Sequence, residues 1–166
     1  MTPLVEYVTA ESSVRDQAAT LRQAPEAPVR TDAVTVIYTS WDETLQAARV
    51  GGQLAAKMGV PLRVIHFRTV PRQLDVDRPD GLSPVETDAF AARLADEGMS
   101  ARVRVFLCRD ETKTIPYAFK PHSIVVIGGH HSWWPTRAER WRHTLEAAGH
   151  LVIVVDPSGL KEHVHA

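Results

Sequence analysis

The sequence is poor in the features that mark secreted, membrane or nucleic-acid-binding proteins. A single cysteine, Cys108, excludes an internal disulfide and fits a reducing compartment. The formal net charge of -1 supplies no basic field for a nucleic acid. No apolar run approaches the roughly 20 residues that cross a bilayer, and a signal-peptide pattern is missing at the N-terminus. We therefore expect a cytoplasmic protein with no nucleic-acid partner and no membrane insertion.

The length of 166 residues and the hydrophobic content of 44% suit one globular domain with an extension. The first 33 residues differ from the rest. "TPLVEYV" (2–8) is compatible with a short strand, and "APEAPV" (24–29) is typical of a stiff linker. We predict an N-terminal extension over residues 1–33, an α/β domain over 34–156 and a tail over 157–166, with the extension either mobile or packed on a partner chain.

From residue 34 onward, apolar strand patterns alternate with helix patterns. Predicted strands cover 34–39 ("VTVIYT"), 61–67, 101–108, 123–128 ("SIVVIG") and 151–156 ("LVIVVD"). Capping-box spacing in "SWDE" (40–43), "SPVE" (83–86) and "TRAE" (136–139) predicts the starts of three helices, and glycines at 59, 98 and 149 predict their ends. A shorter helix is predicted over 110–119.

This alternation predicts an α/β fold, a doubly wound five-stranded parallel sheet with helices on both faces. We expect the strand order 3-2-1-4-5, counting these five strands along the chain. Strand order then reverses between the first and fourth strands, and ligands bind at such a reversal, beyond the carboxyl ends of the strands. The edges of that crevice are residues 39–42 and 128–132.

The segments "VIYTSWDETLQAA", "PLRVIHFRTV" and "HSIVVIGG" resemble the universal stress protein family, of the adenine-nucleotide α-hydrolase-like fold. The resemblance covers residues 34–156 and rests on layout more than on identities. It implies an adenine-nucleotide site and, since such domains occur fused to permeases, a membrane transporter as one kind of partner.

The motif of ATP-binding members is only partly present. Those proteins carry an Asp at the end of the first strand, where this sequence has Thr39. After the fourth strand they carry Gly, two residues, Gly, nine residues, then Gly and Ser or Thr. Gly128 matches the first glycine, but the later positions hold His131, Trp141 and Arg142. Bulky side chains hinder the backbone approach that a phosphate loop needs. We expect a degenerate nucleotide site and no bound cofactor, with ATP or AMP as the alternative.

Eight residues at the crevice are our candidates for ligand binding in either case. The adjacent histidines are open to interpretation as metal ligands, but a metal site needs three or four converging ligands, and capping of the strand end explains these histidines better. We therefore predict no metal site and no catalytic residues. The candidates are Thr39, Ser40, Asp42, Gly128, Gly129, His130, His131 and Arg142.

The tryptophans and arginines near this loop have alternative interpretations. Trp141 shares a helical face with Leu145 and is predicted to lie in the core, whereas Trp133 and Trp134 fit either exposure or a partner contact. Arg142 and the arginines at 137 and 140 suit an anion clamp or a solvated face paired with glutamates.

We predict a non-enzymatic regulatory or binding protein that acts through dimerisation and contacts with another protein. Its last strand, Leu151–Asp156, lies at an open sheet edge and would pair with the same strand of a second chain. A nucleotide-binding module with a non-standard loop is the second hypothesis. The third is a hydrolase or transferase of the wider superfamily.

Overall fold

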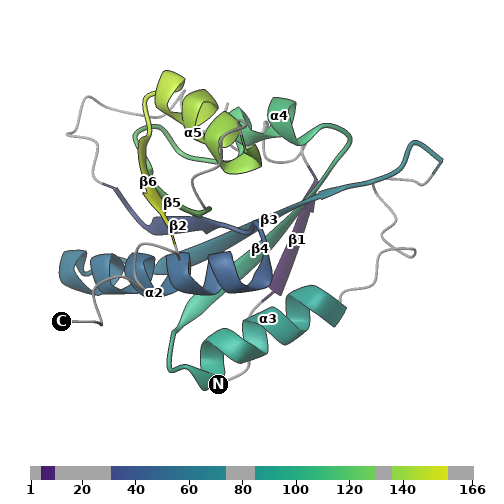
Figure 1. Cartoon of the computed structure of the whole chain (residues 1–166). Helices are drawn as coiled ribbons and strands as arrows, with labels where there is room; N and C mark the ends of the chain where they lie inside the picture. Colours follow the sequence, from purple (N-terminus) through teal and green to yellow (C-terminus); the bar gives the residue numbers. More distant parts are fainter. Residues whose placement is uncertain (1–4, 10–30, 74–84, 130–135, 157–166) are drawn as a thin grey trace.

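The computed structural model describes residues 5–9, 31–73, 85–129 and 136–156. A single parallel sheet runs through the middle of the molecule, with helices on both of its faces (Figure 1). The elements are β1 (Val5–Thr9), β2 (Val34–Ile37), α2 (Trp41–Met58), β3 (Leu62–Thr69), α3 (Val85–Asp96), β4 (Ala101–Cys108), α4 (Glu111–Thr114), the 3-10 helix η1 (Ile115–Tyr117), β5 (Ile124–Gly128), α5 (Arg137–Ala147) and β6 (Leu151–Val155).

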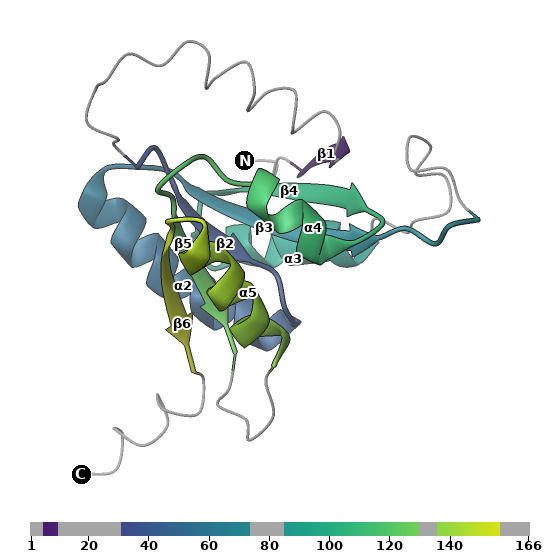
Figure 2. The same cartoon turned by 90° about the horizontal axis from the view of Figure 1, so that it is seen from above.

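The strand order is β1-β4-β3-β2-β5-β6. Its last five members are the five predicted strands, and they lie in the predicted order 3-2-1-4-5, with every neighbouring pair parallel. Helices α2 and α3 cover one face, and α4 and α5 cover the other (Figures 1 and 2). This arrangement follows from right-handed crossovers, because the chain moves across the sheet in one direction through α2 and α3 and in the opposite direction through α4 and α5.

Among the described residues, the sheet has six strands, one more than the five predicted. β1, from the predicted extension, pairs in parallel with β4, so that Val5 lies beside Val103. Arg104 donates to the carboxylate of Glu6 at 2.9 Å, a contact between residues 98 positions apart. The five residues of β1 indicate a strand but not its partner. The partner could not be predicted, because β1 pairs with β4, about a hundred positions away, only in the folded chain.

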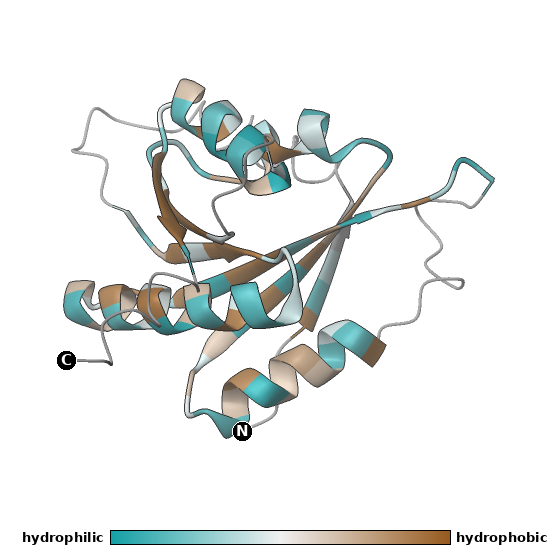
Figure 3. Ribbon diagram, viewed as in Figure 1, coloured by the Kyte–Doolittle hydropathy of each residue, from teal (hydrophilic) through white to brown (hydrophobic). Residues whose placement is uncertain are grey.

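Each face of the sheet has its own apolar core, and the strands stand out as apolar between more polar helices (Figure 3). Phe90 of α3 is 1% exposed and packs with Val36 and Val64 on one face. On the other face Trp141 of α5 is 2% exposed beside Phe67, which confirms the prediction that Trp141 belongs to the core. Among the described helices, none has both the length and the apolar character to cross a membrane.

The ends of the helices mostly follow the sequence signals. The Thr136 side chain caps α5 by accepting the backbone N–H of Glu139 at 3.2 Å. Gly59 ends α2 with φ +67, a left-handed backbone that glycine adopts without strain. The helix predicted over 110–119 is instead a single turn, α4, followed by η1, because Pro116 provides no N–H to continue the α-helical ladder.

Candidate functional site

The predicted crevice lies at the carboxyl ends of β2 and β5, which are adjacent in the middle of the sheet. Here the two strand ends are tied together directly. Thr39 follows β2, and its hydroxyl donates to the carbonyl oxygen of Gly128 at the end of β5, at 3.1 Å. The resemblance to ATP-binding proteins places an Asp where this chain has Thr39. Here the Thr39 side chain donates its hydrogen bond to the adjacent strand β5.

The first turn of α2 holds two further candidates, Ser40 and Asp42. Ser40 is the N-cap residue of α2, as predicted, but its side chain does not make the predicted capping bond. The Ser40 hydroxyl accepts no helix N–H and instead donates to Oε2 of Glu43 at 2.8 Å. The buried hydroxyl of Thr44 instead accepts the N–H of Thr39 at 3.0 Å. Asp42 is exposed, and its negative charge interacts favourably with the dipole of α2, because it lies in the first turn of that helix.

The two glycines at the end of β5, Gly128 within the strand and Gly129 directly after it, allow a helix on each face to approach the sheet closely. A β-carbon on Gly128 would collide with the backbone carbonyl of Glu43 in α2. A β-carbon on Gly129 would lie 2.9 Å from the β-carbon of Ala138 in α5. The N–H of Gly129 is also used, since it donates to the carbonyl of Val155 at 3.0 Å. Close packing alone thus requires glycine at both positions.

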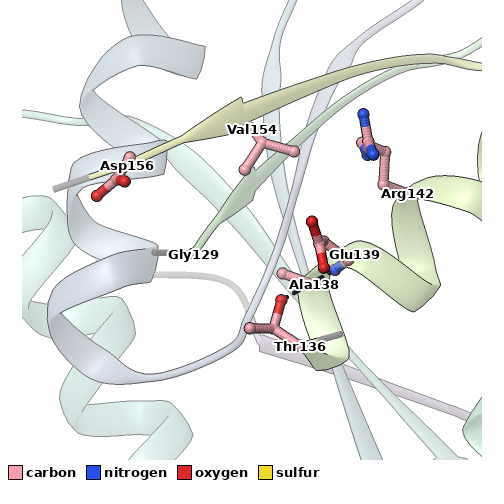
Figure 4. A pocket seen from close by; sticks show the side chains of 7 residues that line it. All are labelled: Gly129, Thr136, Ala138, Glu139, Arg142, Val154 and Asp156. Carbon is pink, nitrogen blue, oxygen red and sulfur yellow. Dashed lines mark hydrogen bonds between the residues drawn. The ribbon is translucent and has the colours of Figure 1, made fainter. Parts of the chain in front are cut away.

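Arg142 lies near Gly129 but on the α5 side, where a small cavity opens between α5 and β6 (Figure 4). Its volume of about 200 Å³ is below the roughly 300–1,000 Å³ of typical ligand pockets. One arginine and two carboxylates border it, so its described lining does not concentrate positive charge. The lining residues are Gly129, Thr136, Ala138, Glu139, Arg142, Val154 and Asp156.

The remaining candidates, His130 and His131, lie outside the described residues, as do Trp133 and Trp134. Within the described ranges, no three His, Cys, Asp or Glu side chains gather as metal ligands. The structure joins Thr39 and Gly128 directly, whereas Gly129 and Arg142 line the same small cavity on the α5 face of the sheet without a described contact between them.

A polar and aromatic cluster next to the crevice was not anticipated from the sequence. Tyr38 directly follows β2, and His66 lies in the adjacent strand β3, next to Ile65, which pairs with Ile37. Their rings are in contact with centroids 4.3 Å apart and planes tilted by 34°. The hydroxyl of Tyr38 donates to Oε1 of Glu86 at 2.7 Å, and Nδ1 of His66 lies 3.3 Å from the hydroxyl of Thr87. These contacts fasten the first turn of α3 to the sheet. The signal was present as the matched triplets "VIY" (36–38) and "VIH" (64–66).

Burial shifts the ionisation of both rings in this cluster. Desolvation, followed by the hydrogen bond and the charge of Glu86, raises the pKa of Tyr38. The pKa of His66 is lowered to about 4, chiefly by desolvation and also by the charge of Arg68, while the charge of Glu86 acts in the opposite direction. At neutral pH the cluster therefore contains a neutral imidazole and a neutral phenol.

Comparison with solved structures identifies the architecture. The chain superposes on a universal stress protein from Archaeoglobus fulgidus with a TM-score of 0.54 and 20% sequence identity, over 76% of this chain and 93% of that chain. A universal stress family protein from Burkholderia pseudomallei gives 0.52 and 17%, over 77% and 98%. The fold is that of the universal stress proteins. No protein-family model and no curated protein matches the sequence.

Trp141, which the resemblance placed at the third glycine of the nucleotide motif, lies in the core. Trp141 packs against Phe67 with ring centroids 6.1 Å apart, and the guanidinium of Arg137 lies 4.4 Å from the centre of the indole. Arg137 also pairs with Glu111. The indole ring is therefore part of the attachment of α5 to the sheet.

Replacing Gly128 tests the close approach of α2. We expect Gly128→Ala to lower the free energy of unfolding by about 3 kcal/mol or more, because the colliding group is backbone and cannot rotate away. Gly52→Ala in the same helix is the matched control. Its β-carbon has 3.7 Å to the nearest atom, so the helix should gain about 0.5–1 kcal/mol. Urea unfolding measures both, and equal stability of Gly128→Ala and wild type would contradict the packing argument.

The lowered pKa of His66 makes stability depend on pH. The unfolded chain binds the proton below pH about 6.5, whereas the folded chain resists it down to about 4. Stability is therefore complete above pH 6.5 and falls toward pH 4, by up to about 3 kcal/mol. His66→Asn should remove this part of the loss, and exposed His143→Asn should not. Identical pH profiles of unfolding for wild type and His66→Asn would show that protonation of His66 does not cause the loss of stability.

Proposed function

We propose that this chain is a non-enzymatic binding protein with the universal stress protein fold, which acts through self-association along β6. We further propose that the same edge contacts another protein and that the crevice between β2 and β5 holds no nucleoside triphosphate. The exposed edge of β6 is the observation that carries the first part of this proposal.

β6 is an apolar strand at the end of the sheet. Its sequence is "LVIVV", and β5 pairs with it on one side. Leu151 is 59% exposed and Val154 is 42% exposed. Within the described residues, no strand pairs with the outer edge of β6, and an apolar edge strand favours pairing with a further strand. Antiparallel pairing with β6 of a second copy, about a two-fold axis, satisfies both chains at once.

The opposite edge of the sheet has a different character. β1 carries Glu6, which pairs with Arg104 of β4, and charged residues on an edge disfavour strand addition. The large side chain of Tyr7 on β1, which is 39% exposed, directly follows the charged residue Glu6. The contrast between the two edges supports β6 as the associating edge.

Three features support a crevice that does not take up a triphosphate. Thr39 is hydrogen-bonded to Gly128 across the strand ends, and Glu43 blocks the approach to Gly128 from the α2 face. The N–H of Gly129, which a phosphate loop would direct to an oxygen, donates to Val155. The cavity beside Arg142 is the feature that favours the second candidate function, the binding of a small anion or other small ligand.

Substitution of Leu151 tests the self-association. At micromolar concentration the wild-type chain should sediment as a dimer, and millimolar ATP should leave its mass unchanged. Leu151→Lys removes apolar burial and places a cation at each end of the paired strands, so we expect roughly a hundredfold weaker association. Val85→Lys is the control, because Val85 is 68% exposed on α3, away from β6.

A wild-type chain that sediments as a monomer at micromolar concentration would overturn the proposed dimer. A dimer that survives Leu151→Lys would move the interface to another surface. An increase in thermal stability with millimolar ATP or inorganic phosphate would favour the small-ligand function.

A further inference from the structure

The start of β6 is fixed to β5 through a buried histidine. His150 immediately precedes β6 and is 7% exposed. The backbone N–H of Ser123, the residue before β5, donates to Nδ1 of the His150 imidazole at 3.2 Å. The next backbone contact follows at once, since the N–H of Leu151 donates to the carbonyl of Ser123 at 3.0 Å. We refer to the contact between the His150 imidazole and the Ser123 N–H as the His150 clamp.

The clamp requires one protonation state. A backbone N–H can only donate, so Nδ1 of His150 must carry no proton, and the neutral ring then carries its proton on Nε2. An imidazolium carries protons on both nitrogens, and its Nδ1–H would face the N–H of Ser123. Because the ring is buried, water cannot readily replace the lost acceptor, and an unsatisfied buried N–H is costly.

The surroundings of the ring also favour the neutral form. Burial lowers the pKa of His150, and the neighbouring His122 lowers it further. His122 has φ +56, and its ring lies so close to Gly149 that a β-carbon added to that glycine would be 3.8 Å from it. Phe119 presents an apolar ring with its centroid 5.7 Å from that of His150. The ammonium of Lys120, from the same loop, is paired with Asp32 at 2.6 Å.

We propose that protonation of His150 releases the start of β6 from β5 and thereby weakens association along the β6 edge. The second half of this inference rests on the proposed function, whereas the first half concerns the single chain. The sign follows from linkage: the clamp is complete above the ordinary histidine pKa of about 6.5 and is lost as the pH falls through the lower value of the folded chain. The β6 edge is therefore an acid-sensitive interface.

Nuclear magnetic resonance on the full chain tests the clamp residue by residue. Between pH 7.5 and pH 5, we expect the imidazole of His150 to titrate below 6.5. The exchange protection of the Ser123 amide, corrected for its intrinsic rate, should fall at least tenfold over the same titration. His150→Asn is the decisive variant, because its amide oxygen can accept the same N–H but does not titrate. Its Ser123 amide should stay protected at both pH values.

His122→Asn is the second variant, and it leaves the clamp itself in place. It should raise the pKa of His150, because the neighbouring imidazole no longer opposes protonation. This variant tests the inference even if His150→Asn does not fold. A His150 that titrates at or above 6.5 in the folded chain, or a Ser123 amide with pH-independent protection in wild type, would overturn the clamp.

Sedimentation across the same pH range separates the two halves. Dissociation at pH 5 in wild type, but not in His150→Asn, supports the regulated interface. A chain that is monomeric at every pH while the Ser123 amide follows His150 supports the clamp and overturns the proposed dimer. A dimer that persists at pH 5 after the clamp has opened overturns the regulation of the edge alone.

Discussion

The architecture depends on the close approach of two helices to the end of β5. Gly128 admits the first turn of α2 on one face of the sheet, and Gly129 admits the start of α5 on the other. With both helices in place, the hydroxyl of Thr39 can reach the carbonyl of Gly128 and join the ends of β2 and β5. The point where doubly wound sheets usually open for a ligand is in this chain a site of dense packing.

The residues around these strand ends have packing roles. Trp141 and Arg137 attach α5 to the sheet, and Tyr38 and His66 attach α3 to the neighbouring strand ends. The hydroxyls of Thr39 and Tyr38 are hydrogen-bonded within the chain, to Gly128 and Glu86. Among the described residues, the edge strand β6 exposes Leu151 and Val154, and the buried His150 that precedes it accepts the N–H of Ser123. We therefore propose function at the sheet edge and not in the crevice.

Much of the fold could be predicted because its signals are local. Runs of β-branched residues, capping residues such as Thr136 and helix-ending glycines such as Gly59 act within a few positions. The central strand order was predicted as the usual order of a doubly wound sheet. The sequence allowed a strand at 2–8, but the place of β1 in the sheet could not be found in this way, because β1 pairs with residues about a hundred positions away. The site was harder still: the packing role of Gly128 depends on Glu43, and the Tyr38 cluster combines three elements.

The central claim is that contacts within the chain hold the carboxyl ends of β2 and β5 together, so that no nucleotide binds between them. The most direct measurement is a crystal structure of the chain grown with a saturating concentration of ATP. Our account predicts that the hydroxyl of Thr39 still donates to the carbonyl of Gly128 and that no adenine lies between the two strand ends. Strand ends that separate around a nucleotide, with the N–H of Gly129 turned from Val155 to a phosphate oxygen, would contradict it.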